Sequence, residues 1–452
     1  MGQSALLLDF YALTMSNAYF NFKPEAKATF DLVIRELPQN RSFFIACGVD
    51  EAISSLKNFS FSKDDITYLK KFNFNNKFLN YLKKFKFSGD IWAVKEGTFI
   101  FPQEPILRIT ASLIEAQLVE AYLLNAINVQ SVIASKAIRI IMAACKKPVF
   151  DFSLRRTQGV DAGLKSARAS YIAGAYGTSN ALAGKLYGIK VAGTMAHSYV
   201  MAFDNELESF RAYTDTFPHQ SILLIDTYNY KQGVKNAISV AKQLKKNGVK
   251  LVGVRLDSGN LIKESKKIRR IFDKSGLSFV KIFASGNLDE YKIDKIVKAQ
   301  APVDFFGVGT NMGVSADAPY SEVIYKICEV AGQGSDFSPT MKLSQNKITC
   351  PGRKQVFRIK NKKGQFVQDL LALEGEKIKA APILFKAMQK GKFLRITENI
   401  ERVRIFVRQQ LKELPDCYKS LTKKVKYPVK ESNQLNLLKQ KMLKKLNEAN
   451  TN

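Results

Sequence analysis

Residues 250–310 read KLVGVRLDSGNLIKESKKIRRIFDKSGLSFVKIFASGNLDEYKIDKIVKAQAPVDFFGVGT, and this stretch decides the fold. It contains three short apolar runs, at 250–257, 279–286 and 303–310. Runs of this length predict buried strands, whereas the amphipathic segments SKKIRRIFDKS and LDEYKIDKIVKAQ between them predict helices. Because parallel strands need a crossover connection, the strand–helix–strand repetition predicts a parallel sheet with right-handed crossovers.

The same alternation extends toward the N-terminus as far as residue 148. Three more apolar runs occur there, PVFDFSL (148–154), IKVAGT (189–194) and SILLIDT (221–227). The helical segments LKSARASYIAGA and GVKNAISVAKQLKKN lie between runs. Six strand runs exceed what a small doubly wound domain needs, so we expect a closed or nearly closed α/β barrel. An open sheet remains the alternative, because a sequence pattern does not show closure.

The flanks of this core have mixed patterns. Residues 1–130 combine a helical start, DFYALTMSNAYF, with the strand-like runs ATFDLVIREL and GDIWAVKEGTFIFP, and 113–145 carries apolar residues at helical spacing. We expect an N-terminal α/β domain over 1–130, which the strand-like stretch at about 340–390 rejoins. The barrel domain then covers 131–340, and 391–452 forms a helical, lysine-rich C-terminal segment.

The chain is strongly basic, with 70 Lys and Arg against 40 Asp and Glu and a formal net charge of +30. Such a charge favours polyanionic partners, so a basic nucleic-acid-binding protein is one alternative. The lysines thicken in 66–87 and 412–446, and aromatic residues interleave with them in the first segment. We interpret 66–87 as an amphipathic helix whose Phe and Leu face a core, because their spacing is helical. No nucleic-acid partner is therefore expected.

The composition also bears on the compartment. Hydrophobic residues at 46% and charged residues at 24% are typical of a globular protein. No run approaches the roughly 18 apolar residues that a membrane span needs, and Asp9 interrupts an N-terminal apolar run that lacks a basic start. The five cysteines are scattered without a CxxC pair, which argues against a disulfide framework or a zinc site. We expect a cytoplasmic protein without a membrane partner.

Glycine, hydroxyl and charged residues follow the predicted strands where each strand ends, and ligands of α/β barrels bind at these carboxyl ends. The ends at 257–259, 285–287 and 307–310 place glycine beside Ser or Thr, which leaves backbone N–H groups open to an anion. The other ends read RRTQG (155–159), GTMAH (193–197) and DT (226–227). Together they predict a site for a phosphorylated, hydroxyl-bearing substrate. From the glycine-containing ends we assign to substrate binding Asp257, Ser258, Gly286 and Gly309.

The two histidines of the chain differ in position. His197 lies in GTMAH immediately after a predicted strand, where an imidazole faces the predicted anion site. There it could act as a nucleophile or a general acid/base near neutral pH, and a purely structural histidine is the alternative. His219 precedes a predicted strand, away from that end of the barrel, and we expect it to be a loop residue.

Six segments stand out together: DFYALTM (9–15), RELPQNRSFFIACG (35–48), LRRTQGVDAGLKSARASYIAGAYGTSNALAGKLYGIKVAGTMAHSYVMAF (154–203), LLIDTYN (223–229), VRLDSGN (254–260) and PGRKQVFR (351–358). They closely resemble the nicotinate phosphoribosyltransferase family, in order, from about residue 5 to residue 360. The resemblance implies an irregular α/β barrel of the type II phosphoribosyltransferase kind. It also implies transfer of phosphoribosyl from phosphoribosyl pyrophosphate to nicotinate, with Mg²⁺ and ATP hydrolysis, giving nicotinate mononucleotide and pyrophosphate in NAD salvage.

The resemblance also implies roles for single residues. His197 matches the family histidine that is transiently phosphorylated. Tyr11 matches an aromatic residue that reaches the pyridine ring across a subunit interface, which implies a homodimer with the active site at that interface. The residues that match nicotinate or phosphoribosyl contacts, or lie beside them, are Arg155, Thr194, Ser198, Arg255 and Thr310.

Elementary chemistry agrees with these roles. Nicotinate is a flat ring with a carboxylate, which suits the guanidinium of Arg255 and an aromatic face. Departure of pyrophosphate leaves positive charge on the ribose, and Mg²⁺ offsets the charge of the leaving group, although no residue is assigned as a metal ligand. Asn260 departs from the aspartate that many relatives carry, so a carboxylate for metal or ribose binding is missing there. The related nicotinamide phosphoribosyltransferase is the alternative enzyme.

Overall fold

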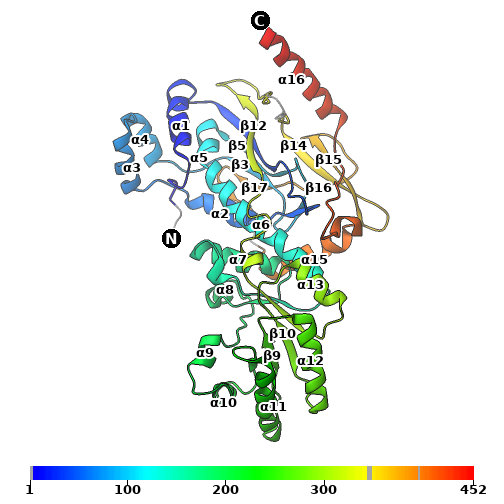
Figure 1. Cartoon of the computed structure of the whole chain (residues 1–452). Coiled ribbons are helices and arrows are strands. Elements are labelled where there is room, and N and C mark those ends of the chain that lie inside the picture. The colour runs from blue at the N-terminus through cyan, green and yellow to red at the C-terminus, as the bar shows by residue number, and fades with distance from the viewer. Residues whose placement is uncertain (1–3, 344–348, 395–397, 452) are drawn as a thin grey trace. The chain divides into compact units, whose positions relative to one another are not determined.

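The computed structural model of the chain describes residues 4–343, 349–394 and 398–451. Parts of the two predicted segments that follow residue 340 lie outside the described residues. The chain divides into two compact units, one formed by Met1–Val132 with Tyr320–Asn452 and the other by Ile133–Pro319. The second unit is drawn mostly in green in Figure 1, and each unit is described by itself.

An antiparallel sheet of seven strands lies at the centre of the first unit, with the order β13-β12-β1-β5-β3-β17-β18 among the described residues. An inner strand, β1, pairs with β5 on one side and β12 on the other, and every residue of β1 except Lys27 is buried. The strands are β1 (Lys27–Ile34), β3 (Asp90–Ala93), β5 (Pro105–Ser112), β12 (Val323–Ala331), β13 (Ser338–Pro339), β17 (Phe385–Gln389) and β18 (Lys392–Phe393). A further pair is β2 (Phe44–Ile45) with β4 (Phe99–Ile100).

The chain returns to the first unit earlier than the sequence pattern predicts. The return begins at Tyr320, not near residue 340, because β12 pairs with β1 along its length. Within the stretch at 340–390, β17 joins the sheet by pairing with β3. The rest of that stretch builds a separate sheet with the order β16-β14-β15-β19. Its strands are β14 (Lys354–Lys360), β15 (Phe366–Leu373), β16 (Ala381–Pro382) and β19 (Val429–Glu431).

Helices cover the sheets of the first unit, and the lysine-rich stretch at 66–87 is among them. The stretch forms two short helices and not one, because a 3-10 turn and a left-handed Asn73 separate them. Its apolar residues Leu69, Phe78 and Leu82 are buried, as expected of amphipathic helices packed on a core. The helices are α1 (Phe10–Phe22), α2 (Val49–Ser55), α3 (Lys63–Leu69), α4 (Asn76–Lys83), α5 (Leu113–Leu118), α6 (Glu120–Ala143), α15 (Ile400–Glu413) and α16 (Asn433–Thr451), with 3-10 turns at Leu56–Asn58, Lys70–Phe72 and Asp416–Lys419. α6 continues into the second unit.

A parallel sheet of six strands forms the second unit, with the order β7-β6-β11-β10-β9-β8 among the described residues. The strands are β6 (Val149–Asp151), β7 (Gly177–Thr178), β8 (Ile222–Leu224), β9 (Gly253–Leu256), β10 (Lys281–Ala284) and β11 (Phe305–Val308). The intervening helices are η3 (Leu154–Arg156), α7 (Val160–Ala173), α8 (Ala181–Tyr187), α9 (His197–Met201), α10 (Glu206–Thr216), α11 (Tyr230–Lys246), α12 (Leu261–Lys274), α13 (Glu290–Lys298) and α14 (Thr310–Gly313). Figure 1 shows α11 and α12 beside β9 and β10.

The predicted strand at 189–194 is reduced to a single bridge between Val191 and Thr178 of β7. The sheet therefore has two edges, β7 and β8, and backbone hydrogen bonds among the described residues do not close it. One side-chain hydrogen bond reaches from this segment to the other edge, because the chain runs on from Val191 to His197, which contacts Thr227 just beyond β8. The described residues thus form an open parallel sheet with helical crossovers, and backbone pairing does not complete the expected barrel.

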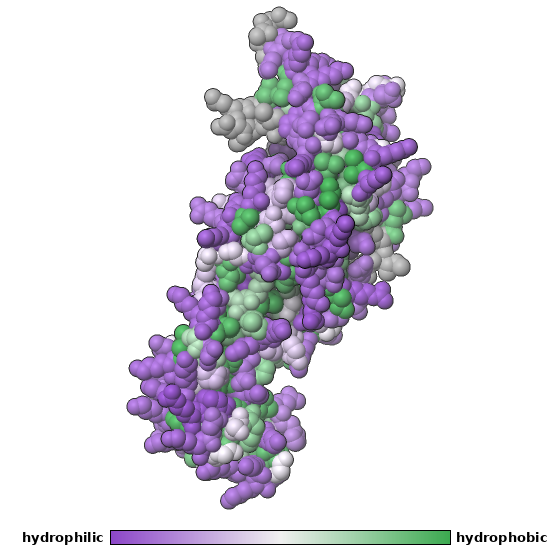
Figure 2. All heavy atoms as spheres, turned by 90° about the vertical axis from the view of Figure 1, so that its right-hand side faces the viewer, coloured by the Kyte–Doolittle hydropathy of each residue, from purple (hydrophilic) through white to green (hydrophobic). Residues whose placement is uncertain are grey.

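The most apolar helical segment is mostly buried, and the drawn face of the surface is mostly hydrophilic. Leu113–Ala143 is long and apolar enough to cross a membrane, but 78% of its most apolar window is buried inside the protein, which is typical of a core helix. The face drawn in Figure 2 is mostly hydrophilic and is broken by small hydrophobic areas.

Candidate active site

A cavity of about 520 Å³ opens at the carboxyl ends of the parallel strands in the second unit. It brings together six of the residues that the sequence predicted: Arg155, Thr194, His197, Ser198, Arg255 and Asp257. The remaining lining residues are Phe152, Leu154, Ser179, Gly193, Met195, Ala196 and Leu224. Chain segments that follow four different strands thus meet at one site, as the position of ligand sites in α/β barrels predicts.

Arg255, in β9, points its guanidinium into a ring of polar partners. Its Nε donates to Ser285 Oγ at 2.7 Å and its Nη2 to Asp257 Oδ1 at 2.5 Å. Its Nη1 donates to Thr194 Oγ1 at 3.1 Å and contacts the Met195 carbonyl at 3.5 Å. Only 14% of the side chain is exposed, so these bonds are shielded from water and hold the cation in place.

An aromatic ring lies behind the same guanidinium. The Arg255 Cζ is 5.6 Å from the centroid of Phe152, which itself stacks on Phe283. A guanidinium over a ring face gains cation–π attraction, and more so where it is desolvated. The cavity therefore offers a fixed cation with an aromatic face beside it.

Asp257 follows β9 and lies between Arg255 and the imidazole of His197. Burial alone would raise the pKa of Asp257, but the hydrogen bond from Ser285 and the charge of Arg255 outweigh it and lower that pKa. Its Oδ2 is 3.9 Å from His197 Nε2, a distance for charge attraction and not for a hydrogen bond. Asp257 is therefore an ionised carboxylate that stabilises positive charge nearby.

His197 is the first residue of α9, and its side chain is 42% exposed. Its Nδ1 is 3.1 Å from Thr227 Oγ1, so Thr227 orients the ring and leaves the edge with Nε2 turned toward Asp257. Sequence reasoning noted the Asp226-Thr227 pair at a strand end but did not assign either residue to the site. An imidazole that is anchored on one side and half exposed is accessible to a reacting group.

Asp226, which follows β8, has one carboxylate oxygen engaged and one without a partner. Its Oδ2 accepts from the backbone N–H groups of Asp257 and Ser258 and from Ser258 Oγ, at 2.7 to 2.8 Å. Its Oδ1 is buried and has no hydrogen-bond partner among the described residues. Ser258 thus positions Asp226 by its own side chain, and Oδ1 is left as a buried acceptor without a donor among the described residues.

The predicted glycine ends lie close to the same residues. Gly286, at φ +92°, packs so tightly that a Cβ there would come within 1.8 Å of the Asp257 carbonyl oxygen, so only glycine fits. Gly309 lies against the Phe152 carbonyl, and Thr310 begins α14. The next residue, Asn311, donates to Asn287 Oδ1 and to the Leu288 carbonyl, both at 3.0 Å, and so ties the two glycine-containing ends together.

The remaining predicted residues lie elsewhere. Tyr11 is on α1 of the first unit, 48% exposed, and burial, then Glu120 and Asp9, raise its pKa. His219 lies in a turn after α10, as expected. Asn260 is the N-cap of α12, where its side chain accepts from the Lys263 backbone at 3.0 Å. Because Asn and Asp cap helices equally well, its departure from aspartate is a neutral exchange in this role.

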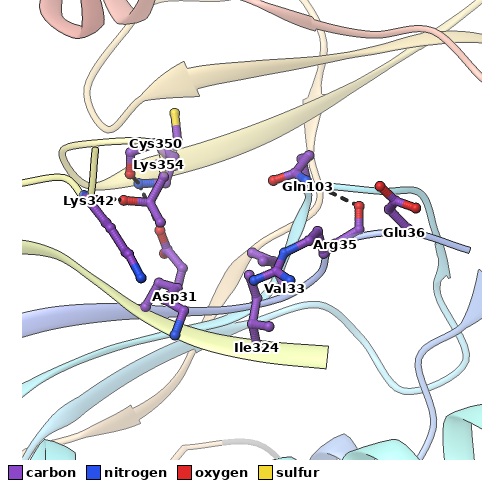
Figure 3. A pocket seen from close by; sticks show the side chains of 11 residues that line it. Asp31, Val33, Arg35, Glu36, Gln103, Ile324, Lys342, Cys350 and Lys354 are labelled. Carbon is purple, nitrogen blue, oxygen red and sulfur yellow. Dashed lines mark hydrogen bonds and ion pairs between the residues drawn. The ribbon is translucent and has the colours of Figure 1, made fainter. Parts of the chain in front are cut away.

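A second cavity, of about 320 Å³, lies in the first unit (Figure 3). Asp31 and Lys354 lie on one side with Lys342 and Cys350, and Arg35 and Gln103 lie on the other. The Lys354–Asp31 pair at 2.7 Å is buried, and the negative charge of Asp31 overcomes burial to raise the Lys354 pKa. This pair joins β14 to β1, so it holds the two sheets of the unit together.

Known proteins resemble this chain along most of its length. Family models described as the nicotinate phosphoribosyltransferase N-terminal domain, family and C-terminal domain match residues 6–128, 148–337 and 377–439. The nicotinate phosphoribosyltransferase pncB2 of Mycobacterium tuberculosis (strain CDC 1551 / Oshkosh) is 43% identical over 434 residues, which cover 95% of this chain and 92% of the relative. The chain belongs to the nicotinate phosphoribosyltransferase family.

Other family members are similar over nearly the whole chain. The nicotinate phosphoribosyltransferase of Bacillus subtilis (strain 168) is 34% identical over 454 residues, covering 94% of this chain and 92% of that protein. The crystal structure of human nicotinic acid phosphoribosyltransferase superposes with a TM-score of 0.87 at 26% identity, covering 96% of this chain and 99% of the human one. A nicotinate-nucleotide pyrophosphorylase from Pyrococcus furiosus gives a TM-score of 0.73 at 26% identity, over 90% and 95%.

Proposed function

We propose that this protein transfers the phosphoribosyl group of phosphoribosyl pyrophosphate to nicotinate in the cytoplasm, as a step of NAD salvage. The observation that carries the proposal is the buried guanidinium of Arg255, fixed over Phe152 in a cavity that also contains His197. A planar base with a carboxylate fits this arrangement, because an arginine fork binds the carboxylate in two places and an aromatic ring packs on a flat ring. An uncharged base would gain no charge-assisted hydrogen bond from this cation.

In the transfer step, the ring nitrogen of nicotinate forms a bond to C1 of the ribose while the bond from C1 to pyrophosphate breaks. The electron pair of the broken bond leaves with pyrophosphate, and positive charge builds up on the sugar. Asp257, ionised and beside the cavity, is placed to hold ribose hydroxyls and to stabilise that charge. Gly286 and Gly309 allow the backbone to approach the phosphate groups closely.

ATP would act through the imidazole of His197. A ring nitrogen attacks the γ-phosphorus, ADP leaves, and a phosphohistidine forms that water later hydrolyses. A phosphoryl group adds a charge of about −1.5 to −2 by analogy with other phosphorylated residues, next to Arg155 and Arg255. That added charge changes how the site binds its anionic substrates, which is how ATP hydrolysis would drive the transfer.

The carboxylates of the site fit a divalent cation. Asp226 Oδ1 is buried without a partner, and Asp257 Oδ2 has no close hydrogen-bond donor among the described residues. Mg²⁺ would need few ligands from the protein, because it keeps water and phosphate oxygens as ligands. When bound, Mg²⁺ would offset the negative charge that develops on pyrophosphate.

We also propose that two copies form each active site. Tyr11, exposed on α1, would reach the pyridine ring in the partner subunit, as the family resemblance implies. Burial and then the charge of Glu120 raise the pKa of its hydroxyl, and the side chain is 48% exposed, so a ring face is available for stacking.

The experiment is a direct comparison of bases. The purified protein is given phosphoribosyl pyrophosphate, Mg²⁺ and either nicotinate or nicotinamide, with and without ATP, and the mononucleotide is quantified. We expect nicotinate to be the better substrate and ATP to increase its use. Preference for nicotinamide would instead support the alternative enzyme, and absence of either product would refute the proposal.

A variant at Arg255 tests whether its charge is the cause of the preference for nicotinate. Arg255→Ala removes the charged hydrogen bonds to the base carboxylate, which are worth about 3 kcal/mol, so kcat/KM for nicotinate should fall by about 100-fold. The effect on nicotinamide should be much smaller, because its amide carries no charge. Equal losses for the two bases would contradict the assignment of Arg255.

A further inference from the structure

We propose that Ser285 is a positioning residue that sets the orientation of Arg255 and thereby the preference for a carboxylate-bearing base. This inference rests on the proposed function. The sequence placed Ser285 in a glycine-containing strand end that was expected to bind phosphate. The structure gives its hydroxyl a different task, because it is 2% exposed and is turned toward the guanidinium.

The hydrogen bonds of Arg255 show what Ser285 controls. A guanidinium has five N–H groups, and four of them have partners here: Ser285, Thr194, the Met195 carbonyl and Asp257. The second hydrogen on Nη2 has no partner among the described residues. Ser285 is the only partner of Nε in that part of the chain, and Nε is the atom that fixes the plane of the fork relative to the side chain.

Ser285 also closes a triangle with Asp257. Its Oγ accepts from Arg255 Nε at 2.7 Å and donates to Asp257 Oδ1 at 2.5 Å, while Asp257 Oδ1 accepts from Arg255 Nη2. One hydroxyl therefore fixes both the cation and the carboxylate. The following residue, Gly286, packs against the Asp257 backbone so tightly that Ser285 has little freedom to move away.

Binding of a base carboxylate follows from this geometry. A two-point contact needs two N–H groups, so the carboxylate takes the unpaired Nη2 hydrogen and displaces one partner that borders the cavity, Thr194 or Asp257. Ser285 remains in place because it is buried, and it keeps the fork in the plane that faces the cavity. Without its hydroxyl, the buried Nε–H loses its acceptor and the fork can rotate away from that plane.

The test compares Ser285→Ala with Ser285→Thr, which keeps a hydroxyl, and with Ser265→Ala as a matched control. Ser265 is also fully buried in the second unit, on α12, and its hydroxyl bonds only to the Ile262 carbonyl among the described residues. For each variant, kcat/KM for nicotinate, KM for phosphoribosyl pyrophosphate and the Ki of nicotinamide as a competitor are measured. Thermal unfolding reports on stability.

We expect Ser285→Ala to lower kcat/KM for nicotinate by about tenfold, the equivalent of one charged hydrogen bond, while the Ki of nicotinamide changes by less than about twofold. Ser285→Thr should recover most of the loss, and Ser265→Ala should change neither constant. Parallel losses for both bases would show a merely structural role. A rise confined to KM for phosphoribosyl pyrophosphate would show a phosphate contact, and either result overturns the inference. If the wild-type protein does not use nicotinate, the proposed function itself fails.

Discussion

His197 has a different neighbour on each ring nitrogen, and this asymmetry defines its chemistry. Thr227 holds Nδ1 at 3.1 Å, while Nε2 lies 3.9 Å from Asp257 and borders the cavity. A histidine with a structural role would be buried with both nitrogens bonded, whereas this side chain is 42% exposed. The ring is thus held on one side and exposed on the other, which is the arrangement that the proposed phosphorylation of His197 requires.

The proposed phosphohistidine predicts that His197→Ala abolishes ATP hydrolysis, because this variant lacks the proposed phosphoryl acceptor. Slow product formation that does not depend on ATP should remain at high substrate concentration, since Arg255 and the glycine-containing strand ends are unchanged in this variant. Release of phosphate and formation of mononucleotide are measured in parallel. His219→Ala, which alters the other histidine of the chain, is the control and should behave as wild type. Retained coupling in His197→Ala would refute the phosphohistidine.

At the residue scale, the sequence predicted the residues that carry obvious chemistry. Arg255 and Thr194 lie near the ends of predicted strands and His197 follows one, so their convergence could be expected from the fold, while their roles were implied by the family resemblance. Phe152 and Ser285 could not be assigned their tasks in the same way. Phe152 reads as one more apolar strand residue, and only the side-chain direction shows that Arg255 lies over its ring.

Strands β14 and β15 are joined by a buried ion pair between Arg358 and Asp369. Arg358 on β14 forms hydrogen bonds with Asp369 on β15 at 2.6 to 3.1 Å, and Glu104 lies 3.8 Å from the same guanidinium. The Arg358 guanidinium therefore interacts with two buried carboxylates, those of Asp369 and Glu104. Burial first, and then the charge of Asp369, raise the pKa of Glu104 well above its ordinary value, against the opposing effect of Arg358.

The raised pKa of Glu104 gives a pH dependence with a definite sign. The folded protein keeps Glu104 protonated where the unfolded chain ionises it, so its contribution to stability is full below the ordinary pKa of 4.5 and is lost as pH rises toward the folded pKa. In that window the loss is about 1.4 kcal/mol per pH unit.

Glu104→Gln should remove this loss, because its amide can donate to Asp369 without a proton being taken up. Urea unfolding at pH 5, 6, 7 and 8 should therefore show a flatter profile for Glu104→Gln than for wild type, and higher stability at pH 8. Glu322→Gln, an exposed carboxylate of the same unit, should give a profile parallel to wild type. Parallel profiles for all three proteins would contradict the raised pKa.

At the element scale, the periodic patterns predicted five of the six parallel strands. β7 was missed because it has two residues, Gly177 and Thr178, which carry no apolar run. The run at 189–194 was predicted as a strand, yet it only bridges to β7, because its chain turns toward His197. The early return of the chain at β12 was missed for a related reason. Local sequence does not identify the partner of a strand when the two strands are hundreds of residues apart.

On the scale of the whole molecule, the predicted site residues divide between the two units. Tyr11 belongs to the first unit and His197 to the second. A homodimer with shared sites would need one residue of this pair from each subunit. The net charge of +30 alone predicts nothing about such an assembly, because it reflects lysines spread over both units.

A mixing experiment tests the shared site. Tyr11→Ala and His197→Ala should each have low ATP-dependent activity, because every site in either homodimer lacks one of the two residues. When the two variants are mixed in equal amounts and allowed to exchange subunits, half of the dimers combine one of each. In such a dimer one site carries both substitutions and the other carries neither, so about a quarter of wild-type activity should return. If Tyr11 acted within its own subunit, every site would keep one substitution and mixing would restore nothing. An affinity tag on one variant shows whether exchange occurred, because the untagged variant is then retained with it, and this separates a failure to exchange from a site built within one chain.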